Sequence, residues 1–158
     1  KGFIKSNSIR NLVIVGNTNN QEYIKSLNLN SDPRIVFLGP IYDKEKLSSL
    51  RKNCYAYFHG HEVGGTNPSL LEALGCGNAV IGIDVNFVRE VAKDAGLYFK
   101  KDVNHITQII NSIDKDIQKV KLMRKNAVNR LLEKYTWELI ASQYEEFFHQ
   151  IYNNKIKE

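Results

Sequence analysis

One short stretch, from His59 to Glu72, gathers most of the side chains in this chain that could do chemistry. It holds two imidazoles, two carboxylates and the adjacent glycines Gly64 and Gly65. A glycine pair lets the backbone pass close to a ligand. Imidazoles can donate hydrogen bonds to a phosphate or a sugar hydroxyl, and carboxylates can accept them from sugar hydroxyls. The combination indicates a site for a phosphorylated, hydroxyl-rich ligand.

The middle of this stretch predicts the start of a helix. Asn67 is a preferred N-cap residue, Pro68 suits the first helical position, and Ser69 adds a hydroxyl to the first turn. The free N–H groups and the positive dipole end of such a helix suit a phosphate. A tight strand–helix turn with an Asn cap and no ligand explains Thr66-Asn67-Pro68 equally well.

The four ionisable side chains of the stretch each have two interpretations. Glu72 lies one turn into the predicted helix, where it could accept hydrogen bonds from sugar hydroxyls or pair with a nearby base. His59, His61 and Glu62 could address a sugar, but a lone histidine is more often a packed or surface residue. His-x-His does not make a zinc site without a third ligand, and none stands at a useful spacing, so no metal is predicted.

The elements that must position this stretch alternate along the chain. Short, β-branched apolar runs predict buried strands, and helical patterns follow them. Unbroken hydrophobic strands joined by helices predict an α/β fold with a Rossmann-like, doubly wound parallel sheet. The expected strands are 12–16, 34–39, 54–58, 79–83 and 97–99, and the expected helices between them are 21–27, 43–51, 68–75 and 87–92.

From about Val103 onward the pattern is only helical. A last helix over residues 136–152 is expected, with Thr136 as its N-cap. Its apolar stripe at helical spacing consists of Trp137, Ile140, Ala141, Tyr144, Phe147, Phe148 and Ile151.

In doubly wound sheets, ligands bind at the carboxyl ends of the strands. Three strand exits therefore matter: residues 16–18, residues 39–41 and residues 59–67. The first, Gly16-Asn17-Thr18, is not a GxGxxG fingerprint, and no acidic residue ends a second strand where a dehydrogenase would hold its ribose. This counts against a nicotinamide enzyme, and no cofactor is predicted.

The composition is that of one globular domain covering residues 1–158, with 42% hydrophobic and 25% charged residues. The formal charge of +5 favours anionic partners such as nucleotides, although solvated basic helix faces explain it as well. No basic run is interleaved with aromatic residues, so nucleic-acid binding is not expected. Cys54 and Cys76 lie among apolar residues without a CxxC neighbour, which predicts buried, reduced thiols in a cytoplasmic protein.

Beyond the residues themselves, the stretch from Gly65 to Ile81 resembles the signature region of glycosyltransferase group 1, the GT-B-fold family of nucleotide-sugar-dependent enzymes. The similarity covers nearly the whole chain. The run from His59 to Glu72 looks still closer to a rhamnosyltransferase-like subgroup that builds bacterial capsule and cell-surface polysaccharides. Further landmarks of the family lie at residues 12–16, 36–40, 89–91, 96–99 and 135–145.

The resemblance implies roles for single residues. The family places the donor diphosphate against the backbone N–H groups of the segment from Gly65 to Leu70, which are those of Gly65, Thr66, Asn67, Ser69 and Leu70, since Pro68 has none. It places the base near Ile41 and the first donor loop at Gly16 and Asn17. Glu72 matches the glutamate that holds the donor ribose. The family's other glutamate would fall at position 64, where this chain has Gly64. Glu62 lies two residues earlier, so His61 and Glu62 are the remaining candidates for the catalytic group, and His59 for donor binding.

The resemblance also implies an architecture. Lys1 is expected late in a helix, so the chain should be a fragment that lacks an amino-terminal acceptor domain and the first strand of its own domain. The whole enzyme would transfer a hexose or deoxyhexose, rhamnose among them, from a nucleoside diphosphate sugar to a glycan or lipid-linked glycan, with peripheral contact to the inner membrane surface. The isolated chain should be inactive. A GT-B-fold nucleotide-sugar epimerase and a non-catalytic nucleotide-sugar-binding domain are the alternatives.

Overall fold

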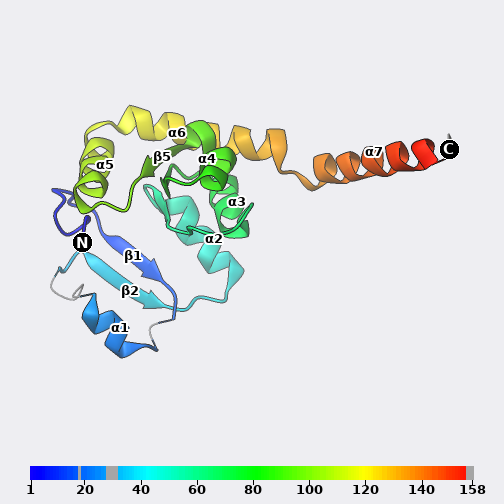
Figure 1. Cartoon of the computed structure of the whole chain (residues 1–158). Coiled ribbons are helices and arrows are strands. Elements are labelled where there is room, and N and C mark those ends of the chain that lie inside the picture. Colours follow the sequence, from blue (N-terminus) through cyan, green and yellow to red (C-terminus); the bar gives the residue numbers. More distant parts are fainter. Residues whose placement is uncertain (18, 28–31, 156–158) are drawn as a thin grey trace.

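The computed structural model describes residues 1–17, 19–27 and 32–155, in which strands and helices alternate before the chain becomes wholly helical (Figure 1). Each predicted element is present, with bounds that differ by a few residues. The elements are β1 Leu12–Val15, α1 Gln21–Ser26, β2 Ile35–Gly39, α2 Lys44–Asn53, β3 Tyr57–His59, α3 Pro68–Gly75, β4 Val80–Ile83, α4 Asn86–Ala92, a 3₁₀ turn Lys93–Ala95, β5 Gly96–Phe99, α5 Val103–Lys115, α6 Ile117–Lys134 and α7 Trp137–Lys155.

All strand pairs are parallel, as predicted, but they form two ladders instead of one continuous sheet. β1 pairs with β2, and β3, β4 and β5 pair in that order. Among the described residues no hydrogen-bonded ladder joins β1 to β3. In Figure 1, β1 lies on the side of β2 that faces helices α2 to α6, and α1 lies on the other side of β2. β1 and β3, like the outer strands β2 and β5, therefore each have one edge without a ladder partner among the described residues.

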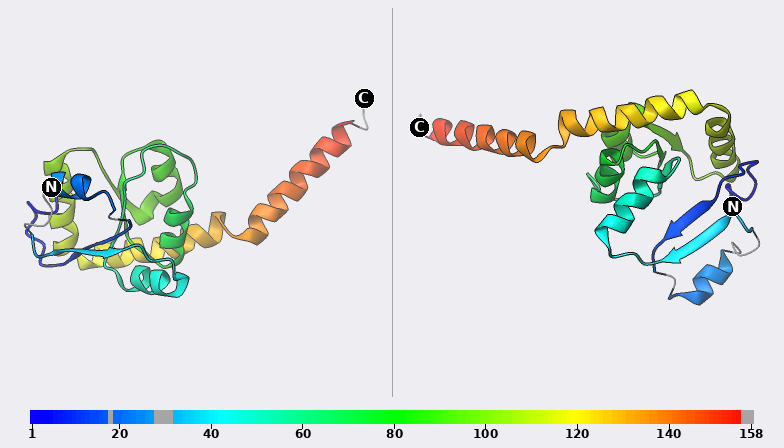
Figure 2. Two further views of the ribbon diagram at one scale, coloured as in Figure 1. Left: turned by 90° about the horizontal axis from the view of Figure 1, so that it is seen from below. Right: turned by 180° about the vertical axis from the view of Figure 1, so that it is seen from behind.

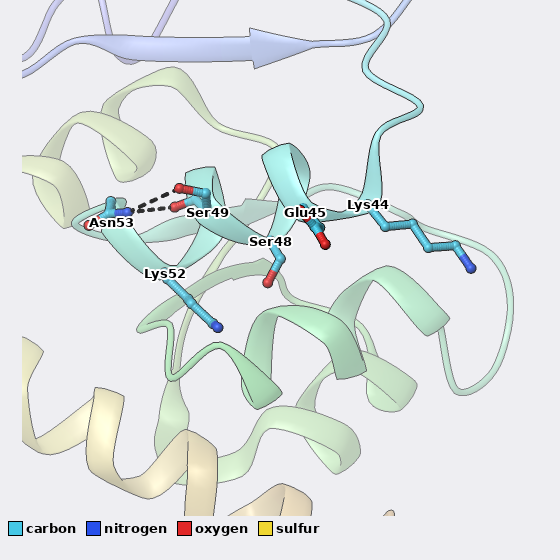
Figure 3. Close-up of a pocket in the computed structure, with 6 residues that line it drawn as sticks. All are labelled: Lys44, Glu45, Ser48, Ser49, Lys52 and Asn53. Carbon is cyan, nitrogen blue, oxygen red and sulfur yellow. Dashed lines mark hydrogen bonds between the residues drawn. The ribbon is translucent and has the colours of Figure 1, made fainter.

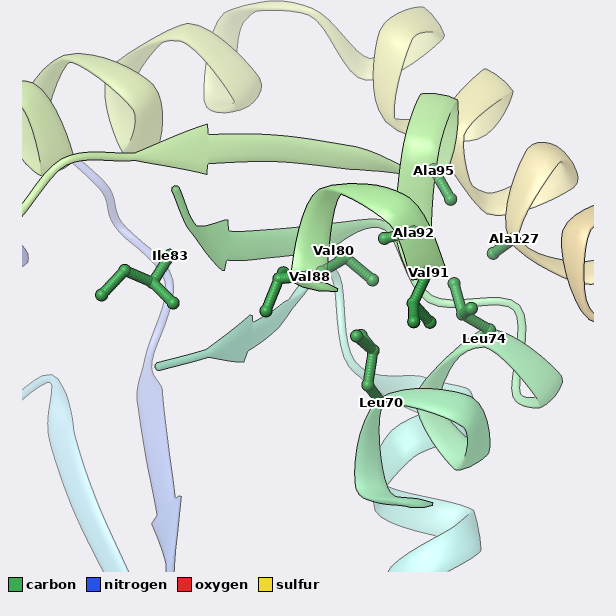
Figure 4. Packing of buried hydrophobic residues seen from close by; sticks show 9 residues of the cluster. All are labelled: Leu70, Leu74, Val80, Ile83, Val88, Val91, Ala92, Ala95 and Ala127. Carbon is green, nitrogen blue, oxygen red and sulfur yellow. The ribbon is translucent and has the colours of Figure 1, made fainter. Parts of the chain in front are cut away.

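The core lies on the two faces of β4, whose four residues are all buried. On one face, Val80 packs with residues of α3, α4 and α6; these are Leu70, Leu74, Val88, Val91, Ala92 and Ala127 (Figure 4). On the other face, Ile81 packs with Ile109, Ile113, Val120 and Met123 of α5 and α6. Burying one such side chain contributes roughly 1.5–3 kcal/mol. Because helices cover both faces, the predicted α/β class is confirmed.

The first ten residues connect the β1–β2 ladder to α5. Residues 2–5 form a turn, closed by a hydrogen bond from Lys5 N to Lys1 O of 3.2 Å. Thr107 Oγ1 donates to Gly2 O at 2.9 Å, and Arg10 Nε pairs with Asp114 Oδ1 at 3.0 Å. These contacts hold the amino-terminal segment on α5, so the position of the smaller ladder depends on it.

Helix α7 extends away from the rest of the fold in all three views (Figures 1 and 2). Thr136 caps it as predicted, since its Oγ1 accepts from Leu139 N at 3.3 Å. The predicted stripe does not enter the core, because Trp137 is 86% and Phe148 61% exposed. No helix among the described residues is long and apolar enough to cross a lipid bilayer.

The prediction that both cysteines are buried is wrong. Cys54 and Cys76 are free thiols of intermediate exposure. The Sγ of Cys76 lies 3.8 Å from Ser48 Oγ on α2, and α2 itself has no buried residue. A thiol beside such a peripheral helix stays partly open to solvent.

Candidate functional site

The loop after β3 leads into α3 through an Asn cap, as predicted. Asn67 Oδ1 accepts from Ser69 N at 2.9 Å and from Ser69 Oγ at 2.6 Å, with Pro68 in the first turn. Tyr57 Oη of β3 donates to Ser69 Oγ at 3.3 Å. The expectation of free amides up to Leu70 needs correction, because Leu70 N donates to Asn67 O at 3.0 Å. The cap has already satisfied the amides of Ser69 and Leu70.

The amides that remain available lie just before the helix. Gly65, Thr66 and Asn67 donate no backbone hydrogen bond to any residue that the structure describes. Gly65 and Thr66 are exposed, and Asn67 is half-buried. These three residues form the approach to α3, the segment that leads to the positive end of the helix. Their N–H groups are thus free to contact an anion.

Gly64 has a backbone conformation that explains why glycine stands there. Its φ is 140°, a value that L side chains rarely adopt, while nothing lies within 4 Å of the place where a Cβ would stand. The backbone, and not a lack of space, therefore disfavours the glutamate that the resemblance implies at this position. Gly65, the next residue, shows no such conformation.

His59, the last residue of β3, is 1% exposed, and neither Nδ1 nor Nε2 has a hydrogen-bond partner among the described residues. Its ring stacks on the exposed ring of His61 with centroids 4.8 Å apart, and the Tyr57 ring lies 6.0 Å away in a tilted orientation. Burial, with a smaller contribution from His61, lowers the pKa of His59 to about 4. At neutral pH His59 is thus a neutral imidazole with one donor and one acceptor unused.

Glu62 turns toward the exit of β5, where it forms an ion pair with Lys101. The two residues border a hollow of about 420 Å³ at the carboxyl ends of β4 and β5, lined by Glu62, Val63, Ile83, Asp84, Val85, Phe99, Lys100 and Lys101. A second hollow, of about 400 Å³, is lined by α2 residues alone (Figure 3). No group of three or more His, Cys, Asp or Glu side chains among the described residues is arranged to hold a metal ion.

Glu72 lies on α3 with its side chain 57% exposed. Its Oε2 is 2.7 Å from Nη1 of Arg51, in the last turn of α2. Glu72 therefore pairs with a basic side chain, which is the second interpretation of this residue from the sequence. The carboxylate nevertheless remains accessible from solvent and close to the capped end of α3.

The other two predicted strand exits lie side by side at the end of the β1–β2 ladder. Gly16 N donates to Gly39 O at 3.0 Å, and half-buried Ile41 follows between β2 and α2. Asn17 is exposed, and its Oδ1 accepts from Asn19 N at 2.8 Å. Thr18 lies outside the described residues. The structure thus groups the predicted residues into two sets, the β1–β2 exit and the stretch from His59 to Glu72.

Three residues that contact the site were missed from the sequence. Tyr57 could have been found, because Tyr57, His59 and His61 alternate with the period of a strand. Arg51 and Lys101 give no local signal, since their partners lie on other elements.

Comparison with known proteins adds to this geometry. The family model for "Glycosyl transferases group 1" matches residues 4–130. The chain belongs to this family. A relative within it is the uncharacterised glycosyltransferase MJ1069 of Methanocaldococcus jannaschii, 30% identical over 149 residues. The alignment covers 90% of this chain but only 37% of that relative. The chain thus spans well under half the length of this group 1 relative.

Solved glycosyltransferase structures share the fold of this group 1 domain. The Alr3699/HepE protein of Anabaena, in complex with UDP, superposes with a TM-score of 0.78 at 20% identity over 94% of this chain and 43% of its own. Sucrose-phosphate synthase of Thermosynechococcus elongatus gives 0.72 at 24% identity over 90% of this chain and 39% of its own. The predicted GT-B assignment is confirmed, whereas the rhamnosyltransferase-like subgroup finds no support.

Proposed function

We propose that this chain is the donor-binding domain of a glycosyltransferase that transfers a hexose or deoxyhexose from a nucleoside diphosphate sugar to a glycan or lipid-linked glycan. The observation that carries the proposal is the open approach to α3, where Gly65, Thr66 and Asn67 present unused amides beside the helix end. The family match does not favour the two alternatives, an epimerase or a non-catalytic binding domain.

The diphosphate would lie against these amides. Backbone donors fixed by the Asn67–Ser69 cap need no rearrangement when negative charge develops on the leaving diphosphate. Such preorganised donors stabilise the transition state more than the ground state. Leu70, whose amide is occupied by Asn67, would contribute only the packing that holds the helix start.

The nucleoside would extend from this point toward the β1–β2 exit. Glu72 would accept hydrogen bonds from the ribose hydroxyls, and Ile41 would contact the base. Gly16 and Asn17 would form the loop on the far side of the diphosphate. The UDP and UDP-glucose complexes of Anabaena Alr3699/HepE make UDP the first nucleotide to test.

The transferred sugar would lie near His59 and His61. The unused nitrogens of His59 favour hydrogen bonding to a hydroxyl or phosphate, since a buried polar group without a partner is costly. His61 and Glu62 remain the candidates for a catalytic group. The Glu62–Lys101 ion pair would have to open for Glu62 to act on the sugar.

The acceptor would bind to a domain outside this chain. The chain covers 37–43% of the relatives above, which leaves room for a second domain. Two unpartnered surfaces support it: the exposed aromatic face of α7 and the free edges of β1 and β3. We propose that an amino-terminal segment packs on α7 and supplies a strand between β1 and β3. Rhamnose transfer, capsule synthesis and a location at the cytoplasmic membrane face are finer parts of the same proposal.

Calorimetry of the full-length protein with UDP, GDP and dTDP tests the proposed site. One nucleotide should bind, and Glu72→Ala should weaken its affinity by about tenfold, as loss of hydrogen bonds to a charged group does. Glu62→Ala, on the other side of the loop, is the matched control and should change affinity less than threefold. Unchanged affinity after Glu72→Ala would contradict the proposed contact between Glu72 and the ribose. If none of the three nucleotides binds, the proposed donor-binding function is wrong.

A further inference from the structure

The two side chains of the Arg51–Glu72 ion pair differ in their exposure to solvent. The Arg51 side chain is 14% exposed, whereas that of Glu72 is 57% exposed. Exposed ion pairs contribute little to stability, so fold stability gives a weak reason for this pairing. A covered guanidinium has few alternative rotamers, and its planar fork fixes the partner that it contacts. The pair thus joins a fixed cation to an accessible carboxylate.

The end of α2 that carries Arg51 is itself held from two sides. Arg51 O accepts from Asn78 Nδ2 at 2.9 Å, and Asn78 is fully buried. Arg124 of α6 donates to Cys54 O at 2.6 Å and to Lys52 O at 3.1 Å. These bonds satisfy carbonyls that the end of a helix leaves free. The backbone that carries the Arg51 side chain is therefore anchored to buried Asn78 and to α6.

Only one oxygen of Glu72 is engaged. Oε2 contacts Arg51, and no residue that the structure describes donates a hydrogen bond to Oε1. We infer that Arg51 is a positioning residue for donor binding, which holds Glu72 by Oε2 and leaves Oε1 oriented toward the two ribose hydroxyls. The inference rests on the proposed function. A carboxylate fixed in advance loses less side-chain entropy when the ligand binds, so affinity rises without a direct contact from Arg51.

A double-mutant cycle in the full-length protein tests this role, with calorimetry of whichever of UDP, GDP and dTDP binds the unaltered protein most tightly. Arg51→Ala should weaken binding by about 3- to 10-fold. In a Glu72→Ala background, the same change should have no further effect, because Arg51 acts through Glu72. Arg51→Lys should restore part of the affinity, since it keeps the charge but not the planar fork.

Arg130→Ala is the control, because it removes a guanidinium of α6 that donates to Val91 O at 3.2 Å and to Glu90 O at 2.8 Å, away from the proposed nucleotide site. It should leave nucleotide affinity unchanged. Equal weakening by Arg51→Ala with and without Glu72 would overturn the inference, and so would an affinity within twofold of the unaltered protein. If Glu72→Ala weakens binding while Arg51→Ala does not, only the inference fails. If Glu72→Ala has no effect, the ribose assignment and the inference fail together.

Discussion

The ring of His59 stacks on the ring of His61 with 4.8 Å between centroids, one residue buried and the other exposed. The His59 side chain is 1% exposed, and this burial lowers its pKa. His59 is thereby kept neutral at the place where we propose the donor sugar binds.

This burial predicts a pH dependence of stability. The folded pKa of His59 is about 4, below its ordinary value of 6.5, so between these values the unfolded chain binds more protons. The contribution of His59 to stability should be nearly constant above about pH 7 and should fall as the pH drops toward 4, by about 3 kcal/mol at most. Urea unfolding of the full-length protein at several pH values measures this. His59→Phe should reduce the dependence of the free energy of unfolding on pH, whereas the same measurement on His149→Gln, a change at an exposed histidine, should match the unaltered protein. A reduced pH dependence in His149→Gln would contradict the attribution to His59.

Gly64 and Gly65 should respond differently to alanine. Gly64→Ala places a side chain at φ 140° and should cost about 1–2 kcal/mol, although the Cβ itself meets nothing. Gly65→Ala has the same open space without that conformation and should change stability by less than about 0.5 kcal/mol. Thermal unfolding compares the two variants. Equal effects would show that the Gly64 backbone is not constrained.

Loss of the α3 cap should affect both stability and nucleotide binding. Asn67→Ala removes the acceptor for Ser69 N and Ser69 Oγ and should cost about 1 kcal/mol. Nucleotide affinity should fall as well, because the amides of the approach to α3 lose their fixed geometry. Asp116→Ala removes the comparable cap of α6, where Asp116 Oδ1 accepts from Lys119 N at 2.9 Å. It should cost similar stability and leave affinity unchanged; reduced affinity in both variants would point to a global effect.

The proposed strand between β1 and β3 predicts a pattern of amide exchange. Leu12 N and Gly16 N donate toward β2, so the N–H groups of Val13 and Val15 face the free edge of β1. Tyr57 N donates to Ala79 O, so Phe58 N faces the free edge of β3. Hydrogen exchange of the full-length protein should show protection at Val13, Val15 and Phe58. Fast exchange there, beside protected Leu12 and Tyr57, would exclude an inserted strand.

The chain of 158 residues alone should transfer little or no sugar, because the proposed acceptor domain is absent from it. Product formation from UDP-glucose, followed by mass spectrometry with the full-length protein as the positive control, measures this. Robust sugar transfer by the isolated chain would contradict the proposal that the acceptor binds to a domain outside it.

Much of the fold could be predicted from the sequence because its signals are local. β-branched runs such as Leu12–Val15 and Val80–Ile83 specify strands, and Asn67-Pro68 specifies a helix start, through the conformations of the residues themselves. The element order and the parallel pairing follow from these signals, whereas the resemblance to group 1 glycosyltransferases rests on the stretch from Gly65 to Ile81.

Tertiary structure alone decided which groups meet. Nothing near Glu72 in the chain indicates Arg51, because the contact depends on how α2 packs beside α3. The burial of His59, the separation of the two ladders and the exposure of α7 are likewise properties of packing between distant segments. An apolar stripe such as that of α7 specifies a helix with one hydrophobic face, but the surface that covers this face must come from other elements.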